Sequence, residues 1–286
     1  MLSPRQIFED NIRPADLLLK VFRLLEHDAL NTEEALLRSL RELVNAKEDE
    51  SLLVISNGIF LGLIRELAEV PPSAIKRSAL CNLLRQAVVT ASIALETYLP
   101  ILLRDQLPEV IRLRGRDFVP KRDEEIKNQF KTLTFGLDEV VRILVDPDPL
   151  FVANKIVSSL NFNYLSGKRG IHVTGALLAL DNPWSLIAQQ LGRVEEEIKK
   201  TLDDTVSRRN DIVHRADRSQ KEPAGAAQEI GFPWAKQAVE TIRVVCLALD
   251  DLVTSRLKEL KQQAAASEPQ EAVSEPQAPS EPSGTA

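Results

Sequence analysis

The sequence predicts an all-α fold, and two features of the chain support that prediction. Apolar residues recur three and four positions apart in ADLLLKVFRLLEH (residues 15–27) and TEEALLRSLRELV (residues 32–44), which is the spacing of one face of an α-helix. Strand patterns are few and short, and the β-branched start of residues 51–70 is where a short strand competes with a helix. We therefore expect one α-helical domain over residues 1–262.

The first half of the chain contains one long predicted helix, which begins after the PPS sequence at residues 71–73. Its broad apolar face is formed by Leu80, Leu83, Leu84, Ala87, Val88, Ala91, Leu95, Tyr98 and Leu99. Pro100 has no amide hydrogen to donate, so the helix is expected to end or kink near Leu99. The least polar stretch contains Glu96 and Pro100, which favours a core helix over a membrane span.

The second half of the chain is expected to alternate helices with loops. A basic loop, RLRGRDFVPKR, precedes them, and the GKRG and DNP sequences are expected to break the chain between them. Helical patterns cover residues 123–146, 148–165, 184–214 and 234–260. The third of these patterns predicts one or two helices that end near His214, and a loop then leads to the last helix.

The C-terminal segment, residues 263–286, differs from the rest in composition. It repeats the triplet SEP three times and carries glutamates without a single cation, a composition that predicts disorder. The formal net charge is −6 for the chain, of which −4 lies in this tail, so −2 remains for the body. A nearly neutral body can still present a basic patch, and the acidic total therefore does not exclude RNA as a partner.

Composition narrows the class of protein further. The N-terminal MLSPRQIFEDN has no apolar core of a secretory signal. Cys81 and Cys246 lie in apolar helical patterns, which favours buried thiols in a reducing compartment over a disulfide. His27, His172 and His214 are scattered without the spacing of zinc ligands. We expect a cytoplasmic protein with no metal, no cofactor and no membrane partner.

The segment RRNDIVHRADR, residues 208–218, is the strongest candidate for a functional site. It gathers four arginines and one of the three histidines of the chain. An apolar stripe that passes through Ile198, Leu202 and Thr205 reaches Arg209 at its next step. Because a guanidinium on an inward-facing stripe is costly without a partner, Arg209 is expected to be paired.

His214 lies near the C-terminal end of the same predicted helix. The helix dipole favours a cation at that end. Asn210 and Asp211, four and three residues earlier, lie on the same face, so either could hydrogen-bond the ring and set its tautomer.

Glu96 is the only charged residue between Arg85 and Arg104. A lone carboxylate in such an apolar helix needs a cation or several hydrogen-bond donors. Arg209 is the obvious partner. The alternative that the residues leave open is a purely structural ion pair, with His214 capping the helix.

These residues carry a resemblance to a known family. RRNDIVHR resembles the R-x4–6-H signature of the HEPN superfamily, in which a polar residue, often Asn, follows the arginine. LLRQAVVTASIALETYL (residues 83–99) is similar to an earlier core helix of its RiboL-PSP-HEPN branch, which is rich in small apolar residues and carries an acidic position. The opening FEDNIRPADLLLKVF and the last helix agree with it in order and spacing, so the resemblance covers most of residues 7–260. It implies a HEPN-type helical bundle with an elaborated N-terminal half, which dimerises with two such motifs facing one another.

The resemblance also implies an activity, because many HEPN proteins are metal-independent endoribonucleases that act as toxins or in antiviral defence against phage. Arg209 and His214 match the signature pair, Asn210 matches its polar position, and Glu96 matches the upstream acidic position. In such a site the 2′-hydroxyl of RNA is the nucleophile. His214 would transfer the proton and Arg209 would stabilise the charge that develops on the phosphorane.

The partners that follow are RNA and a second copy of the chain. One histidine per chain supplies one proton-transfer group, which fits a composite site in a homodimer. Arg208, Arg215 and Arg218 are expected to hold flanking RNA phosphates, and a toxin would need an antitoxin or another regulator protein. Ala216 stands where some HEPN toxins carry a tyrosine that a partner nucleotidyltransferase modifies, so that mode of neutralisation is not expected.

Two other hypotheses remain open. One is a non-catalytic HEPN interaction or RNA-binding module, in which Glu96 and Arg209 are structural. The other is an unrelated helical adaptor, in which these two residues are not neighbours. A nuclease needs His214 exposed in a groove beside Arg209. The long insertion between residues 105 and 190 either sets the substrate or enlarges the core.

Overall fold

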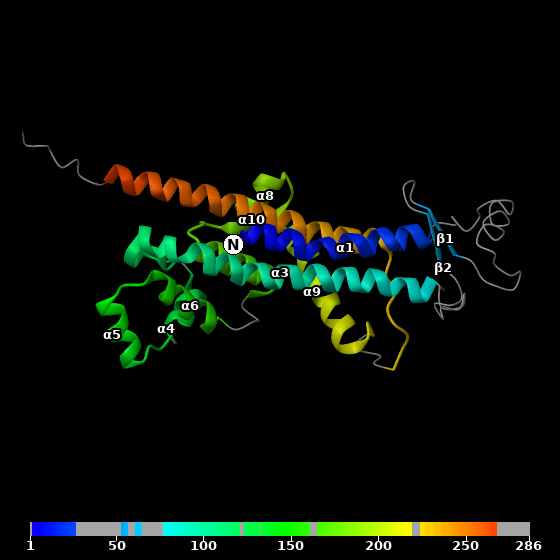
Figure 1. Ribbon diagram of the computed structural model, residues 1–286, viewed down its shortest axis with the longest axis horizontal. Coiled ribbons are helices and arrows are strands. Elements are labelled where there is room, and N and C mark those ends of the chain that lie inside the picture. Colours follow the sequence, from blue (N-terminus) through cyan, green and yellow to red (C-terminus); the bar gives the residue numbers. More distant parts are fainter. Residues whose placement is uncertain are drawn as a thin grey trace, which may run out of the picture.

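The computed structural model describes residues 2–26, 53–56, 61–64, 77–120, 123–131, 133–160, 165–218 and 224–267. Over these residues the fold is helical apart from one short hairpin, which confirms the all-α prediction. The three longest helices, α1 (Pro4–Glu26), α3 (Arg77–Arg114) and α10 (Phe232–Ser267), run side by side along the molecule (Figure 1). The other elements are β1 (Leu53–Ser56), β2 (Leu61–Ile64), the 3-10 helix η3 (Gly115–Phe118), α4 (Glu124–Lys131), α5 (Leu137–Val145), α6 (Pro149–Ser159), α7 (Gly167–Leu177), α8 (Pro183–Leu191) and α9 (Glu195–Arg215).

Helix α1 begins with a capping box. The Ser3 hydroxyl accepts a hydrogen bond from the amide of Gln6 at 3.2 Å, and the Gln6 side-chain oxygen accepts one from the amide of Ser3 at 3.0 Å. Pro4 occupies the first helical position, where the missing amide hydrogen is not needed. The buried face of α1 packs against α3 and α10 and consists of Phe8, Ile12, Ala15, Leu19 and Phe22.

Helix α3 forms the centre of the bundle and continues to Arg114 through Pro100 and Pro108. Of the two predicted outcomes at Pro100, an end or a kink near Leu99, the end is therefore wrong. A proline inside a helix costs about 3 kcal/mol, whereas each fully buried leucine contributes roughly 2 kcal/mol. Beyond Pro100 the helix buries Leu102, Leu103, Leu107 and Val110 against its neighbours, which is enough to offset both prolines.

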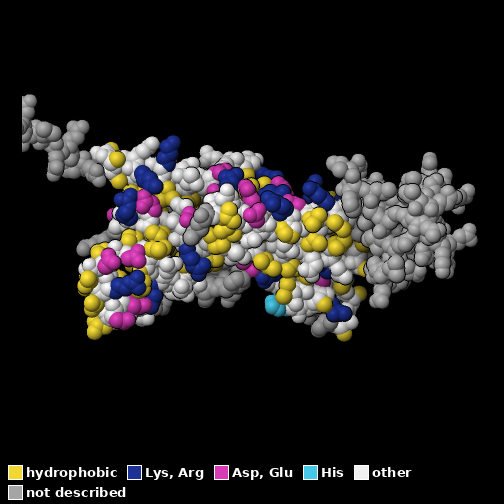
Figure 2. Space-filling model, in the orientation of Figure 1, with side chains coloured by type: hydrophobic (Ala, Val, Ile, Leu, Met, Phe, Trp, Pro, Cys, Tyr) yellow, Lys and Arg dark blue, Asp and Glu magenta, His cyan; other side chains and the backbone are white. Residues whose placement is uncertain are grey.

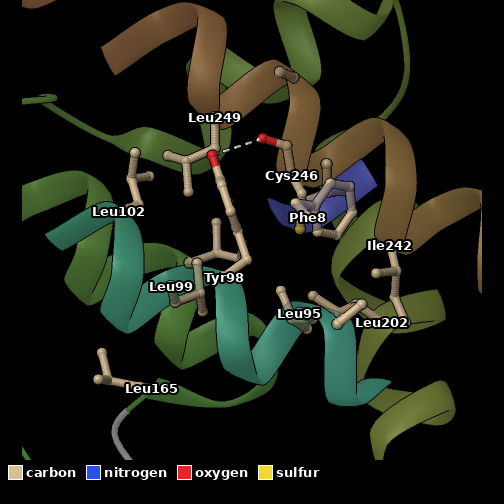
Figure 3. Packing of buried hydrophobic residues seen from close by; sticks show 14 of the residues in the cluster. Phe8, Leu95, Tyr98, Leu99, Leu102, Leu165, Leu202, Ile242, Cys246 and Leu249 are labelled. Atoms are coloured by element: carbon tan, nitrogen blue, oxygen red, sulfur yellow. Dashed lines mark hydrogen bonds between the residues drawn. The ribbon is translucent and has the colours of Figure 1, made fainter. Parts of the chain in front are cut away.

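Tyr98 joins α3 to α10 inside the core. Its hydroxyl donates to the backbone carbonyl of Cys246 at 3.3 Å (Figure 3) and lies 3.0 Å from a carboxylate oxygen of Asp250. The Tyr98 ring packs on Phe8 of α1, with 5.1 Å between the ring centroids. Cys246 is a buried free thiol and Cys81 is half-buried and also free, which confirms the prediction that they do not form a disulfide.

Strands β1 and β2 form an antiparallel hairpin in which Leu53 lies opposite Ile64 and Ser56 opposite Leu61. At the β-branched start of residues 51–70, where the sequence left strand and helix open, the structure has a strand. The helix predicted over residues 32–44 lies outside the described residues.

The described part of the segment between α3 and α9 enlarges the core. Helices α6 and α7 both pack against α3. The GKRG sequence, expected as a break, instead opens α7, so that expectation is wrong. A Cβ on Gly170 would lie 2.5 Å from the carbonyl carbon of Leu165 and 2.7 Å from the Leu99 side chain, so glycine permits this close approach. The expected break at DNP is present, because Asn182 is the left-handed N-cap residue of α8.

Helix α10 continues to Ser267, past the boundary predicted at residue 262. Its last buried residues are Leu257 and Leu260, and the residues that follow extend the helix into the segment that was expected to be disordered. The rest of that tail, residues 268–286, lies outside the described residues.

Among the described residues, one helical stretch, Ala79–Arg114 in α3, is long and apolar enough to cross a membrane by length and composition. In its most apolar window, 61% of the residues are buried inside the bundle. Core helices of other proteins pass the same test, so this stretch is weak evidence for a membrane span.

Candidate functional site

Glu96 and Arg209 meet between α3 and α9. Nη2 of Arg209 donates a hydrogen bond to Oε2 of Glu96, and the two atoms are 2.5 Å apart. The Arg209 side chain is 15% exposed and the Glu96 side chain is 6% exposed. Ile198, Leu202 and Thr205 are buried, so the apolar stripe of α9 leads inward to Arg209 as predicted. The hypothesis of an unrelated adaptor required these two residues to be apart, and the contact contradicts it.

Each member of this pair depends on the other. Burial raises the pKa of the Glu96 carboxyl above its ordinary value, and the charge of Arg209 opposes that rise. Nε of Arg209 is buried and has no hydrogen-bond acceptor among the described residues, so hydrogen bonds to the protein replace only part of the hydration that the guanidinium loses on burial. Loss of either partner would leave an uncompensated charge in the interior.

Asn210 connects the buried pair to the surface, because its Oδ1 accepts a hydrogen bond from Nη1 of Arg209 at 2.9 Å. His214 lies one helical turn beyond Asn210 on the same side of α9 and is exposed. The ring of His214 forms no hydrogen bond with a residue that the structure describes. The contact that the sequence allowed, from Asn210 or Asp211 to the ring, is therefore not formed. Both acceptors are engaged with arginines, Asn210 with Arg209 and Asp211 with Arg215.

Arg209 and His214 point to different sides of α9. Five residues correspond to about 140° around a helix axis, so the guanidinium faces α3 while the ring faces outward. A site that uses both groups of one chain therefore needs the exposed edge of the guanidinium. A site that uses groups of two chains does not have this restriction.

Helix α9 ends at Arg215, close to the predicted end, where two residues other than glycine adopt left-handed backbone. Ala216 has φ +49° and Asp217 has φ +61°. The amide of Asp217 donates to the carbonyl of Asp211 at 2.9 Å, which closes the last turn. Such a backbone costs on the order of 1 kcal/mol per residue, so the surroundings must hold it in place.

A buried carboxylate supplies that support. Asp217 is fully buried, and its Oδ2 accepts a hydrogen bond from Nε of Arg85 at 2.7 Å and one from Nη2 of Arg208 at 3.0 Å. Arg85 and Arg208 also donate to the carbonyl of Gln228, at 2.8 and 3.2 Å. Asp217 thus joins α3, α9 and the segment that leads to α10.

Asp217 and Arg85 were not among the residues that the sequence singled out. Arg85 lies about three helical turns before Glu96, and so on the same face of α3, which is the one sequence feature that could have indicated it. Nothing in the sequence distinguishes a buried Asp217 from a solvated one.

The three predicted phosphate ligands differ in accessibility. Arg208 is mostly buried, and it forms an ion pair with Asp217 and hydrogen bonds to two backbone carbonyls of the loop. Arg215 pairs with Asp211 on its own helix. Arg218 is exposed, and its Nε donates to a backbone carbonyl of the following loop at 2.9 Å. Their binding of RNA stays a prediction, and Arg208 has a structural role in addition.

Two exposed apolar side chains border the Glu96–Arg209 pair. Ile93 lies one turn before Glu96 and is 50% exposed, and Val213 lies one turn after Arg209 and is 51% exposed. The contacts of α3 with Arg209 and Asp217 show that the two helices cross in antiparallel directions, so Ile93 and Val213 lie at the same level. The C-terminal end of α9 projects beyond the edge of α3 here (Figure 1).

His172, which the sequence did not assign to a site, lies elsewhere. Its Nε2 is 2.7 Å from Oδ2 of Asp123, beside a cavity of about 510 Å³ that Arg114 and Asp181 also line. Among the described residues, no three His, Cys, Asp or Glu side chains are grouped so that they could hold a metal ion. His27 lies outside the described residues.

No protein-family model, curated protein or solved structure matches this chain. Membership of the HEPN superfamily therefore stays a prediction that rests on the resemblance of two segments.

Proposed function

We propose that this chain is a metal-independent endoribonuclease of the HEPN type, a toxin or phage-defence effector that acts as a homodimer. The observation that carries the proposal is the buried pair of Glu96 and Arg209, joined through Asn210 to the side of α9 on which His214 is exposed. One chain thus offers a fixed guanidinium and, about 140° around α9, an accessible imidazole, and these are the two kinds of group that the reaction needs.

The reaction requires no group outside the RNA and the protein. The imidazole of His214 takes the proton of the 2′-hydroxyl, whose oxygen attacks the adjacent phosphorus. The bond from phosphorus to the 5′-oxygen breaks, and that oxygen takes a proton. The products are a 2′,3′-cyclic phosphate and a 5′-hydroxyl end. Arg209 uses one hydrogen on each terminal nitrogen for Glu96 and Asn210, which leaves the second hydrogen on each for the phosphorane oxygens.

A dimer supplies what one chain lacks. The 5′-oxygen must receive a proton while the 2′-oxygen loses one, and among the described residues each chain offers one histidine at this site. Exposed Ile93 and Val213 beside the pair favour a surface that another chain covers. With two copies facing each other there, the histidine of one chain is the base and that of its partner is the acid.

A second candidate function is a non-catalytic interaction or RNA-binding module. Arg209 is only 15% exposed and gives hydrogen bonds to two internal acceptors. His214 also lacks a described side chain that orients its ring. In this alternative Glu96 and Arg209 set the helix packing, and the exposed side of α9 binds without cutting.

The deciding experiment incubates the purified full-length chain with total RNA in EDTA and maps the new ends. The nuclease is expected to leave cyclic-phosphate ends, and His214→Ala is expected to abolish them. His172→Ala is the matched control, because that ring is also partly exposed but is paired with Asp123 away from the site. Arg209→Lys keeps the charge opposite Glu96 while removing the planar fork that can bind a phosphate, so its activity should fall sharply.

The outcomes separate the two functions. Cleavage lost in His214→Ala and kept in His172→Ala supports the nuclease, provided that circular dichroism shows both variants folded. Intact RNA with folded, dimeric wild type, together with RNA binding that weakens as salt rises, favours the binding module. Cleavage that survives His214→Ala rules out the proposed mechanism.

A further inference from the structure

Helix α5 is attached to the protein by its polar side. Glu139 forms an ion pair with Lys155 of α6, with a nitrogen–oxygen distance of 2.7 Å. Arg142 stacks over the ring of Phe151, 4.5 Å from its centroid, and lies 3.9 Å from the carboxylate of Asp148. No residue of α5 is buried. A surface helix normally turns its apolar stripe to the core, so α5 has the opposite orientation.

The apolar side of α5 faces away from the protein. Leu137, Leu144 and Val145 are 81%, 76% and 80% exposed, and Val140 and Val141 are also exposed. Their spacing of three, four, seven and eight residues places them on one stripe about 140° wide. Hydrophobic side chains gather at the end of the molecule where α5 lies, with acidic and basic ones beside them (Figure 2).

The stripe is too apolar and too continuous for an ordinary solvated face. Single exposed leucines are common, whereas five large side chains on one stripe are typical of a surface that a partner covers. Helices that present anchors at this spacing dock into apolar grooves of other proteins. Because α5 is held by ion pairs and not by core packing, covering the stripe does not require the fold to rearrange.

The charges around the stripe indicate the chemistry of the partner. Asp138 and Asp146 are exposed and form no ion pair with a described residue, whereas Arg142 and Lys155 have acidic partners. Asp138 borders one edge of the stripe and Asp146 follows its C-terminal end, and these two positions form an acidic rim. An acidic rim repels RNA phosphates and anionic lipid headgroups, and a membrane-surface helix would carry lysine and arginine there. It attracts a protein surface with lysine or arginine beside an apolar groove.

We propose that the stripe of Leu137, Val140, Val141, Leu144 and Val145 is a docking surface for a protein partner that offers an apolar groove bordered by cationic residues. The surface lies on the insertion between α3 and α9, and it does not depend on the nuclease proposed above. It gives that insertion a role in recruitment.

The test uses the full-length chain and three fluorescent helical peptides of equal length. The first has a leucine stripe flanked by lysines, the second has the same stripe flanked by glutamates, and the third has the lysines with a glutamine stripe. Binding is followed by fluorescence anisotropy at low and high salt. The first peptide is expected to bind tightest and to weaken as salt rises, because salt screens the acidic rim. Hydrogen exchange should show protection of α5.

Variants locate the binding. Val141→Gln/Leu144→Gln should weaken the first peptide at least about tenfold, since docked anchors carry most of the affinity. Because α5 buries no side chain, these substitutions leave the fold intact. Leu17→Gln is the matched control, an exposed leucine on α1, and it should change nothing. Asp138→Asn/Asp146→Asn should remove the salt dependence.

Three results would overturn the proposal. One is equal binding of the two leucine-stripe peptides, or binding of neither. Another is sedimentation in which Val141→Gln/Leu144→Gln alone dissociates an oligomer, which would assign the stripe to a second copy of this chain. The third is wild-type binding to phosphatidylglycerol vesicles that this double variant abolishes. None of these results depends on RNA cleavage.

Discussion

The buried pair of Glu96 and Arg209 allows a quantitative prediction about stability. Surface ion pairs contribute about 0–1 kcal/mol, whereas removal of one partner from a buried pair costs about 3–5 kcal/mol. With side chains 6% and 15% exposed, this pair belongs to the second class. Arg209→Met, which keeps an unbranched apolar stem similar to that of arginine and removes the charged guanidinium, is expected to lower the free energy of unfolding by about 3–5 kcal/mol.

A double-mutant cycle separates the pair from its surroundings. Glu96→Gln/Arg209→Met removes both charges, so its cost should be smaller than the sum of the two single costs by about 2 kcal/mol or more. Arg13→Met is the matched control, because Arg13 is 76% exposed and lies 3.2 Å from Asp10 in a surface pair. It should cost less than about 1 kcal/mol.

The cost of Arg209→Met should also depend on pH. The pKa of Glu96 is raised by burial, so the folded chain holds that proton more tightly than the unfolded chain. For such a group the stability is fully present below the ordinary pKa and is lost as pH rises through the raised value. Arg209 limits that loss in the wild type. Without Arg209 the pKa rises further, so the variant should lose more stability at about pH 8 than at about pH 5.

The assay is urea unfolding followed by circular dichroism, at both pH values. The reasoning is refuted by an Arg209→Met cost no greater than that of Arg13→Met, or by single costs that add without coupling. If the stability lost in Arg209→Met were instead larger at acid pH, the charge of Arg209 would not be what stabilises the ionised Glu96 carboxylate.

Three further outcomes are expected. Asp217→Asn keeps a side chain that tolerates left-handed backbone but leaves Arg85 and Arg208 without their carboxylate. Urea unfolding should show that the free energy of unfolding falls by about 3 kcal/mol, and a fall of less than about 1 kcal/mol would argue against the network. Ser3→Ala removes the capping hydroxyl of α1 and should cost about 1 kcal/mol in the same assay, with no change expected if α1 is frayed at its start. Val213→Asp changes an exposed residue, so stability should stay within about 0.5 kcal/mol while sedimentation shows monomers, and an unchanged dimer would place the interface elsewhere.

The Glu96–Arg209 contact could be predicted because each residue breaks the pattern of its own helix. A single carboxylate among apolar residues and a guanidinium at the next step of an apolar stripe both require a partner, and the chain offers few others. The helical segments could be predicted for the same reason, since the spacing of apolar residues is local information.

Features that depend on tertiary packing could not be predicted in this way. Pro100 is a local signal for a helix end, and the helix continues because residues from other elements cover the next turns. Gly167 and Gly170 are local signals for a loop, but both lie in α7, and the lack of a side chain on Gly170 lets this helix pass close to Leu99 and Leu165. In α5 the apolar spacing is correct for a helix, but the sequence does not say which side faces the protein.

The charges on α3 explain why α9 has one orientation, whichever function is correct. Arg85 and Glu96 lie on the same face of α3, and they pair with Asp217 and Arg209. If α9 ran in the opposite direction, Arg209 would lie opposite Arg85. Asp217 would lie opposite Glu96, and both contacts would be repulsive. The paired charges therefore fix the position of α9 along α3. That position determines where His214 is exposed. The nuclease and the binding module thus share the same helix packing, and they differ in whether the exposed side of α9 cleaves RNA or only binds a partner.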